Sequence, residues 1–108
     1  MKKSFVMVLI TCSSKREAAL IADSLLRKRL VACSNIIDNV ASKFWWNGNI
    51  DKARETLVTC KTSCNNFKAV EREVKKLHSY KVPEIIALPI ARLSKDYMRW
   101  IESSVIQI

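Results

Sequence analysis

The chain contains a single glycine, Gly48, which follows Asn47 between two runs of β-forming residues. Asn-Gly between apolar runs is the strongest short signal for a two-residue hairpin turn, because both central residues adopt positive φ. Residues 31–46 hold no proline or glycine, and residues 50–62 are expected to form the return strand. The sequence therefore predicts one long β-hairpin, with a bend near residues 38–39 in its first strand.

Trp45 and Trp46 end the first strand of this hairpin, directly before the turn. Successive side chains of a strand point to opposite faces. One indole is therefore expected to face the chain's own core, and the other is expected to face away from it. The outward indole needs a cover, and an apolar strand at a sheet edge invites pairing with another chain. The hairpin thus predicts a protein that is not a monomer.

A strand and a helix are expected before the hairpin. Residues 5–12 are nearly continuous in apolarity, which is typical of a central strand covered on both faces. A helix is expected to follow as far as about Arg29, because Ser14 and Glu17 form a capping box and apolar residues then recur at helical spacing.

After the hairpin, Ser63 is expected to cap a second helix that ends near residues 78–80. The last strand is expected within residues 82–90, where Pro89 cannot donate to a ladder and so predicts an edge or bulged strand. Ser94 is expected to start a short terminal helix whose apolar stripe faces the core, namely Tyr97, Trp100 and Ile101.

The resulting order, β-α-β-β-α-β plus a terminal helix, predicts an α+β fold of the ferredoxin-like kind in a single domain over residues 1–108. In this topology the first and third strands are central and the second and fourth are edges. Both helices cover one face of the sheet. The other face is bare unless another subunit covers it.

Composition predicts a cytoplasmic protein with reduced thiols. No apolar run approaches the roughly 20 residues of a membrane span, and the run over residues 5–10 is shorter than the roughly 7–15 residues of a signal segment. The four cysteines form no C-x-x-C pair and no zinc-finger spacing, so they are expected to be free. The net charge of +9 is spread along the chain, which indicates a solvated basic surface and no specific nucleic-acid partner.

Five segments of the chain resemble CutA, the family of small trimeric divalent-cation tolerance proteins. They lie in family-like order and are spread over residues 29–101: "RLVACSNI" (29–36), "FWWNGNI" (44–50), "LVTCKT" (57–62), "LHSYKVPEIIALPI" (77–90) and "DYMRWI" (96–101). The resemblance implies a ferredoxin-like homotrimer in which the long hairpin reaches onto the neighbouring subunit. It also implies that this neighbour covers the outward indole of Trp45 and Trp46.

The residues favour a protein without enzymatic activity. The chain has one histidine, no nucleophile elbow and no glycine-rich loop that could cradle a phosphate. No cofactor is required for folding, because 49% of the residues are hydrophobic and can form a core.

The resemblance also implies copper or another divalent cation as a ligand. The family's proposed site uses the histidine that corresponds to His78 and, in some members, a cysteine in the first strand. Here that strand position is Ile10, and Cys12 lies two residues further on the same face. The candidate ligands are therefore His78, Cys12 and Glu84. The alternative for His78 is a helix C-cap residue.

Tyr80 and Glu84 flank the last strand and are candidates for a cleft between subunits, where ligand sites are common. Lys61 is a weaker candidate, since a solvated lysine is the ordinary explanation at the end of a strand. Two classes of function follow: a metal-tolerance or scaffolding trimer, and a small-ligand sensor like the PII-type signalling trimers. The tight Asn47-Gly48 turn counts against the sensor, and the sequence leaves any protein partner open.

Overall fold

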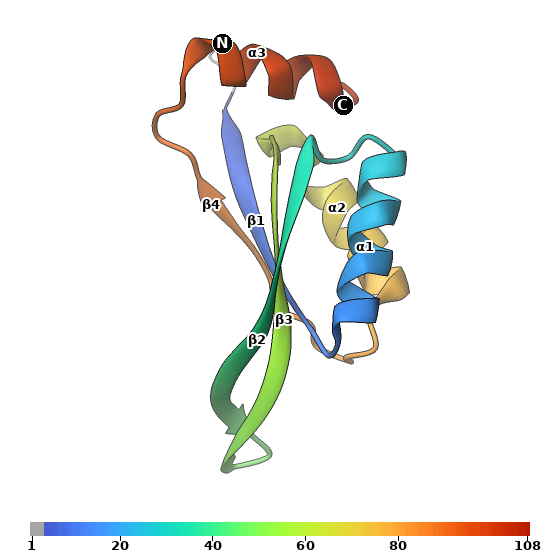
Figure 1. Ribbon diagram of the computed structural model, residues 1–108, viewed down its shortest axis with the longest axis vertical. Coiled ribbons are helices and arrows are strands. Elements are labelled where there is room, and N and C mark those ends of the chain that lie inside the picture. The colour runs from blue at the N-terminus through green and yellow to red at the C-terminus, as the bar shows by residue number, and fades with distance from the viewer. Residues whose placement is uncertain (1–3) are drawn as a thin grey trace.

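The polypeptide follows the predicted order of strands and helices in the computed structural model, which describes residues 4–108. Figure 1 shows a twisted sheet with two helices on one side and a third helix across one end. The elements are β1 (Phe5–Cys12), α1 (Lys15–Arg27), β2 (Cys33–Trp46), β3 (Asn49–Ser63), α2 (Phe67–Leu77), β4 (Ile85–Pro89) and α3 (Lys95–Ser104).

The four strands form one antiparallel sheet in the order β2-β3-β1-β4. The ferredoxin-like arrangement is thus confirmed, with β1 and β3 in the centre and β2 and β4 at the edges. Pro89 pairs with Val6 on the edge strand β4, a position that tolerates a residue without a backbone donor.

The core lies between the sheet and the helix pair α1 and α2 (Figure 1). Alternate residues of β1 and β3 point to this side, as strand geometry requires. The helices supply apolar residues at helical spacing. The buried set includes Val6, Val8, Ile10, Cys12, Ile21, Leu25, Val58, Cys60, Val70 and Val74. No helix within residues 4–108 is long and apolar enough to cross a membrane.

The three predicted helix starts have different outcomes, and the start at Ser94 is confirmed by a hydrogen bond from the Tyr97 N–H to the Ser94 Oγ at 3.2 Å. The Ser14 Oγ accepts a hydrogen bond from the Glu17 N–H at 3.1 Å, so that cap is confirmed. The predicted cap at Ser63 is wrong, because its side chain makes no capping bond and a 3-10 turn over Cys64–Asn66 separates it from α2. The buried Asn66 holds that turn by donating from Nδ2 to the carbonyl oxygens of Leu30 and Ile106.

The hairpin extends well beyond the rest of the sheet (Figure 1). Pairing of β3 with β1 ends at Thr56, so the remainder of the hairpin is a two-stranded ribbon. The turn residues Asn47 and Gly48 have φ values of 51° and 79°, as the Asn-Gly signal predicts. The predicted bend is confirmed by a register shift between Ile37 and Val40.

Neither tryptophan of the hairpin faces the chain's own core, so that prediction is wrong. Trp45 is 72% exposed and Trp46 is 48% exposed, because the ribbon extends past the helices that cover the sheet. Phe44 and Ile50 on the same ribbon are exposed as well. The end of the hairpin therefore carries a group of exposed apolar side chains, Phe44, Trp45, Trp46 and Ile50, which we call the hairpin patch.

The stripe of α3 follows its prediction only in part. Ile101 is fully buried, but Tyr97 and Trp100 are about 40% exposed. This helix lies across one end of the sheet, where less of its surface is in contact with the core than the spacing alone suggests (Figure 1).

Candidate functional site

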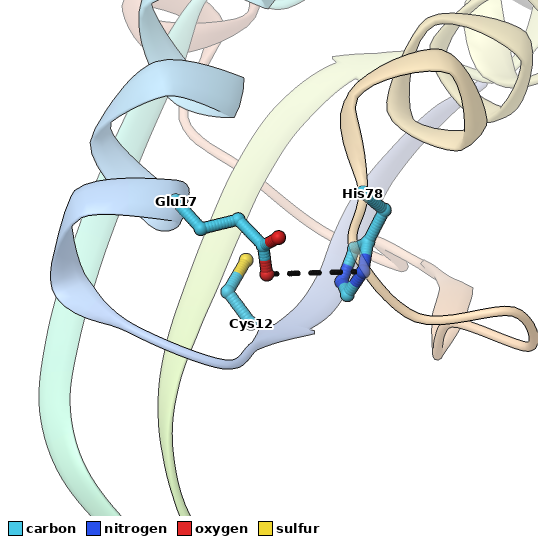
Figure 2. A group of neighbouring side chains, drawn as sticks. All are labelled: Cys12, Glu17 and His78. Atoms are coloured by element: carbon cyan, nitrogen blue, oxygen red, sulfur yellow. Dashed lines mark ion pairs between the residues drawn. The ribbon is translucent and has the colours of Figure 1, made fainter.

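Three side chains with metal-ligating atoms meet where β1 ends and α1 begins. The ligand atoms of Cys12, Glu17 and His78 all lie within 4.8 Å of one another (Figure 2). Two of the three predicted ligands, Cys12 and His78, are therefore neighbours. Glu84 is not part of this group, and the sequence analysis missed Glu17 as a member. Its membership could have been predicted, because Glu17 lies in the first turn of the helix that directly follows the strand carrying Cys12.

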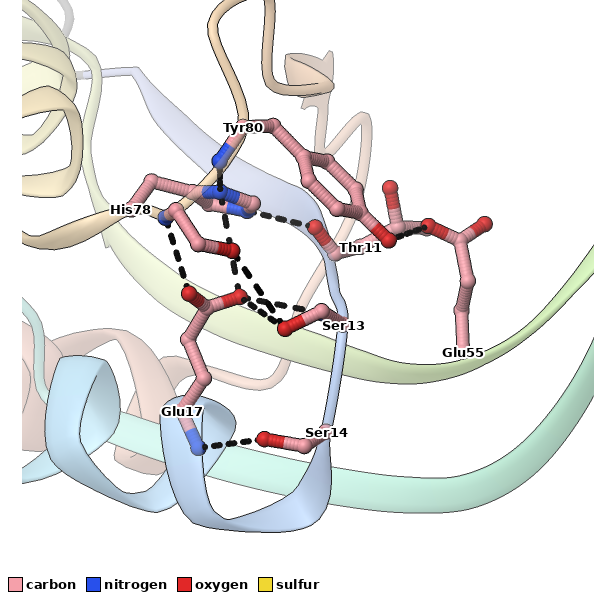
Figure 3. A network of polar contacts seen from close by, with 8 residues as sticks. Thr11, Ser13, Ser14, Glu17, Glu55, His78 and Tyr80 are labelled. Carbon is pink, nitrogen blue, oxygen red and sulfur yellow. Dashed lines mark hydrogen bonds and ion pairs between the residues drawn. The ribbon is translucent and has the colours of Figure 1, made fainter.

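His78 is held by hydrogen bonds at both of its ring nitrogens. Its side chain is fully buried. Its Nε2 lies 2.7 Å from the Thr11 carbonyl oxygen, and its Nδ1 accepts a hydrogen bond from the Tyr80 N–H at 3.0 Å (Figure 3). A backbone N–H can only donate, so Nδ1 is the acceptor and Nε2 carries the proton. Both ring nitrogens are thus engaged in binding the backbone, and His78 also occupies the C-cap position of α2.

Glu17 joins the start of α1 to the segment that follows α2. Its Oε1 accepts from the Ser13 N–H at 2.9 Å, and its Oε2 accepts from the Ser79 N–H at 2.8 Å. Burial alone raises the pKa of the Glu17 carboxyl, but the bonds from Ser13 and Ser79, together with nearby His78, leave that pKa below its usual 4.5. Glu17 is therefore a carboxylate at neutral pH with its oxygens already bonded.

Cys12 is fully buried beneath this network. Burial, with smaller contributions from the charges of Glu17 and Glu55, raises the pKa of its thiol to about 12. A thiolate is the form that binds metals, and this thiol stays protonated at neutral pH. Imidazole, thiol and carboxylate are suitable ligand types for copper. Here, however, the thiol is protonated, and both imidazole nitrogens and both carboxylate oxygens already form hydrogen bonds within the protein. The group therefore does not fit a tightly held resident metal.

A cleft of about 1030 Å³ lies beside this group, between the hairpin and the segment 79–84. Four of the predicted residues line it: Tyr80, Glu84, Trp45 and Trp46. Lys61 does not. Its Nζ donates to the Asn35 Oδ1 at 2.8 Å on the sheet, away from the cleft.

Glu55 is a residue of the cleft that the sequence analysis missed. It is only 7% exposed, and its Oε2 accepts a hydrogen bond from the Tyr80 hydroxyl at 2.8 Å (Figure 3). Burial, this bond and the charge of Glu55 raise the pKa of the Tyr80 phenol to about 12. Tyr80 in turn is held by His78, whose ring centre lies 4.8 Å from its own.

Comparisons with known proteins agree with the resemblance in the sequence. Residues 6–104 match the family described as CutA1 divalent ion tolerance protein. A divalent-cation tolerance protein CutA from Thermus thermophilus is 40% identical over 90% of this chain and 94% of its own length. Its counterpart from Archaeoglobus fulgidus is 44% identical over 91% of this chain and 95% of its own length.

Solved structures match over nearly the whole length. A structure described as the periplasmic divalent cation tolerance protein CutA from Archaeoglobus fulgidus has a TM-score of 0.92 at 42% identity and covers 94% of this chain and 99% of its own. The structure of CutA1 from Oryza sativa has a TM-score of 0.94 at 32% identity and covers 97% and 96%. Sequence and fold together place this chain in the CutA family of divalent-cation tolerance proteins.

Proposed function

We propose that this protein serves divalent-cation tolerance as a non-enzymatic homotrimer. The relatives that match nearly end to end carry divalent-cation tolerance in their names. The absence of enzymatic activity is supported by the site itself, where the one histidine is buried and both of its nitrogens bind the backbone. A general base needs a free ring nitrogen within reach of a substrate proton, and His78 does not offer one.

The hairpin patch is the observation that carries the proposed assembly. It holds two tryptophans, a phenylalanine and an isoleucine that are all exposed when residues 4–108 are taken alone. Aromatic residues of this size are typical anchors of protein interfaces. The outer edge of β2 is also unpaired along its length, since β2 pairs only with β3. A second copy can cover both features in a closed symmetric assembly, and the family resemblance implies that the assembly has three copies.

Metal binding is proposed to be weak and transient, with His78 as the main ligand and Cys12 beside it. Binding has to displace the bonds of the imidazole to Thr11 and Tyr80, and the proton of the Cys12 thiol, so the affinity is low. We expect a Cu(II) dissociation constant weaker than about 1 μM, and weaker still for Zn(II), because copper lies higher in the usual affinity order.

Titration calorimetry on the wild type and on His78→Ala checks this prediction. The copper signal is expected to disappear in His78→Ala and to persist in the matched control Glu84→Gln, which changes a carboxylate outside the group of Cys12, Glu17 and His78. Unchanged copper affinity in His78→Ala would remove His78 from the site. Nanomolar affinity in the wild type would show that further ligands converge there.

The cytoplasm is proposed as the location, and the thiols support it. All four cysteines, Cys12, Cys33, Cys60 and Cys64, are free. Free thiols persist in a reducing compartment. The name of the Archaeoglobus fulgidus relative places that protein in the periplasm, so this relative does not support a cytoplasmic location. The proposal for this chain is supported by its free thiols.

Thiol titration in denaturant without reductant is expected to recover four thiols per chain from freshly purified protein. Recovery of two or none would reveal a disulfide and contradict the assignment to a reducing compartment.

A further inference from the structure

Glu55 is a buried acidic residue without a cationic partner. It is 7% exposed, and its one hydrogen bond is the 2.8 Å contact from the Tyr80 hydroxyl to Oε2. Among residues 4–108, no lysine, arginine or histidine side chain forms an ion pair with it. Burying a carboxylate without a cation is costly, so such a group is usually paired when the protein is in its working state.

The cleft offers Glu55 a partner from outside the chain. Within residues 4–108, the hydrogen bond from the Tyr80 hydroxyl to Oε2 is the one polar contact of the Glu55 carboxylate (Figure 3). Glu55 is also the only buried charged residue of the lining. The other charged residues there are all exposed, namely Lys43, Asp51, Lys52, Lys81 and Glu84. The buried part of the cleft is therefore negative, although its rim carries both signs.

Aromatic side chains form much of the remaining lining: Phe44, Trp45, Trp46 and Tyr80. Aromatic faces attract cations through the ring quadrupole, and they also pack against apolar groups. A volume of about 1030 Å³ is at the upper end of that of small-molecule sites. The cleft thus combines a buried anion, aromatic walls and room for an organic molecule.

We propose that this cleft binds a small organic cation, whose ammonium or guanidinium group pairs with Glu55 and whose apolar part packs on Phe44 and Trp46, which the strand register places on the same face of the hairpin as Glu55. A divalent metal fits the cleft less well, because the described residues bring three metal-ligating groups together only at Cys12, Glu17 and His78. The proposal goes beyond metal tolerance and does not depend on it. Trp45 and Ile50 lie on the opposite face of the hairpin, so a second copy can cover them without filling the cleft.

The segment after α2 positions the binding groups. His78 holds the backbone of Tyr80 through the 3.0 Å bond to Nδ1, and the Tyr80 hydroxyl fixes one oxygen of Glu55. The second oxygen remains available for a cation. His78 and Tyr80 are therefore positioning residues, and Glu55 is the residue that contacts the ligand.

A charge series of one small probe tests the proposal on the wild-type full chain. Benzylammonium is expected to bind saturably by titration calorimetry and to perturb the tryptophan fluorescence. Benzyl alcohol and benzoate, which keep the ring but replace the positive charge, are expected to bind at least about tenfold more weakly, since the pairing with a buried carboxylate is lost. The series needs no variant, so the result stands even if substitutions at Glu55 impair folding.

Glu55→Gln is expected to reduce benzylammonium affinity by about tenfold or more, to the level of benzyl alcohol. Glu84→Gln is a matched change of an exposed carboxylate on the same cleft. It is expected to keep most of the preference for benzylammonium over benzyl alcohol and benzoate. Equal binding of the three probes by the wild type, or an unchanged preference in folded Glu55→Gln, would overturn the proposal. So would a wild type that binds no probe while Glu55→Gln loses its assembly, because Glu55 would then pair with a side chain of a second copy.

Discussion

Replacing Trp45 or Trp46 with aspartate is expected to convert the assembled protein into smaller species at micromolar concentration. Both indoles are exposed on the isolated chain, at 72% and 48%, so the substitutions remove little from the subunit's own core. In an interface the same positions become buried, and an aspartate there would be an unpaired buried charge. We expect a loss of about 2 kcal/mol or more per interface, as for other aromatic anchors.

Sedimentation of the variants measures this effect, with circular dichroism to show that each chain is folded. Leu20→Asp is the matched control, since Leu20 is an apolar side chain on α1 that is 56% exposed and lies away from the hairpin. It is expected to leave the assembly intact. Dissociation by Leu20→Asp but not by either tryptophan variant would move the interface from the hairpin to the helix layer.

His78→Ala is expected to lower the free energy of unfolding by about 3 kcal/mol. The imidazole is fully buried and binds two backbone groups, the Thr11 carbonyl at 2.7 Å and the Tyr80 N–H at 3.0 Å. Alanine leaves both groups without this partner and leaves a void beside Cys12. Each unsatisfied buried polar group costs about 1–3 kcal/mol, so the structural role of His78 predicts a large effect without any metal.

Denaturant unfolding in the presence of a metal chelator measures this loss at one fixed protein concentration. Lys81→Ala is the control, because it alters an exposed side chain of the same segment and is expected to change the free energy by less than about 0.5 kcal/mol. If His78→Ala lowers the free energy of unfolding by less than about 1 kcal/mol in the presence of the chelator, the imidazole does not stabilise the fold through the Thr11 and Tyr80 backbone. That result would favour a role of His78 in ligand binding.

The fold was largely predictable because its elements have strong local signals. The single Asn-Gly pair set the hairpin turn, and Pro89 indicated an edge strand. Apolar spacing identified the buried face of α1. These signals depend on backbone geometry and on which face of an element is apolar, and both can be read from neighbouring residues.

The surroundings of the hairpin were less predictable, because they depend on where the ribbon lies relative to the helices. Strand alternation predicts that two successive indoles point to opposite faces of the strand. Alternation does not say whether helices cover either face at that end of the hairpin. The ribbon passes the helices before it reaches Trp45, and both indoles are exposed as a result.

The candidate site was predictable only for residues that stand out by type. His78 was predicted from the family resemblance, Cys12 was predicted because its thiol lies on the strand face of the family's cysteine, and Tyr80 was predicted with the segment before the last strand. Glu17 and Glu55 are ordinary acidic residues in sequence, and only the packing of β1, β3 and the segment 78–84 gives them their roles. The residues labelled in Figure 3 come from separate parts of the chain: the end of β1 with the start of α1, then β3, and then the segment that follows α2.

We propose that this chain works as a homotrimer, assembled through its exposed hairpin. Sedimentation equilibrium of the wild type at micromolar concentration tests it most directly. A single species of three times 12.4 kDa is the expected result. A stable species of 12.4 kDa under the same conditions would contradict the account, because the hairpin patch would then be exposed in the working protein.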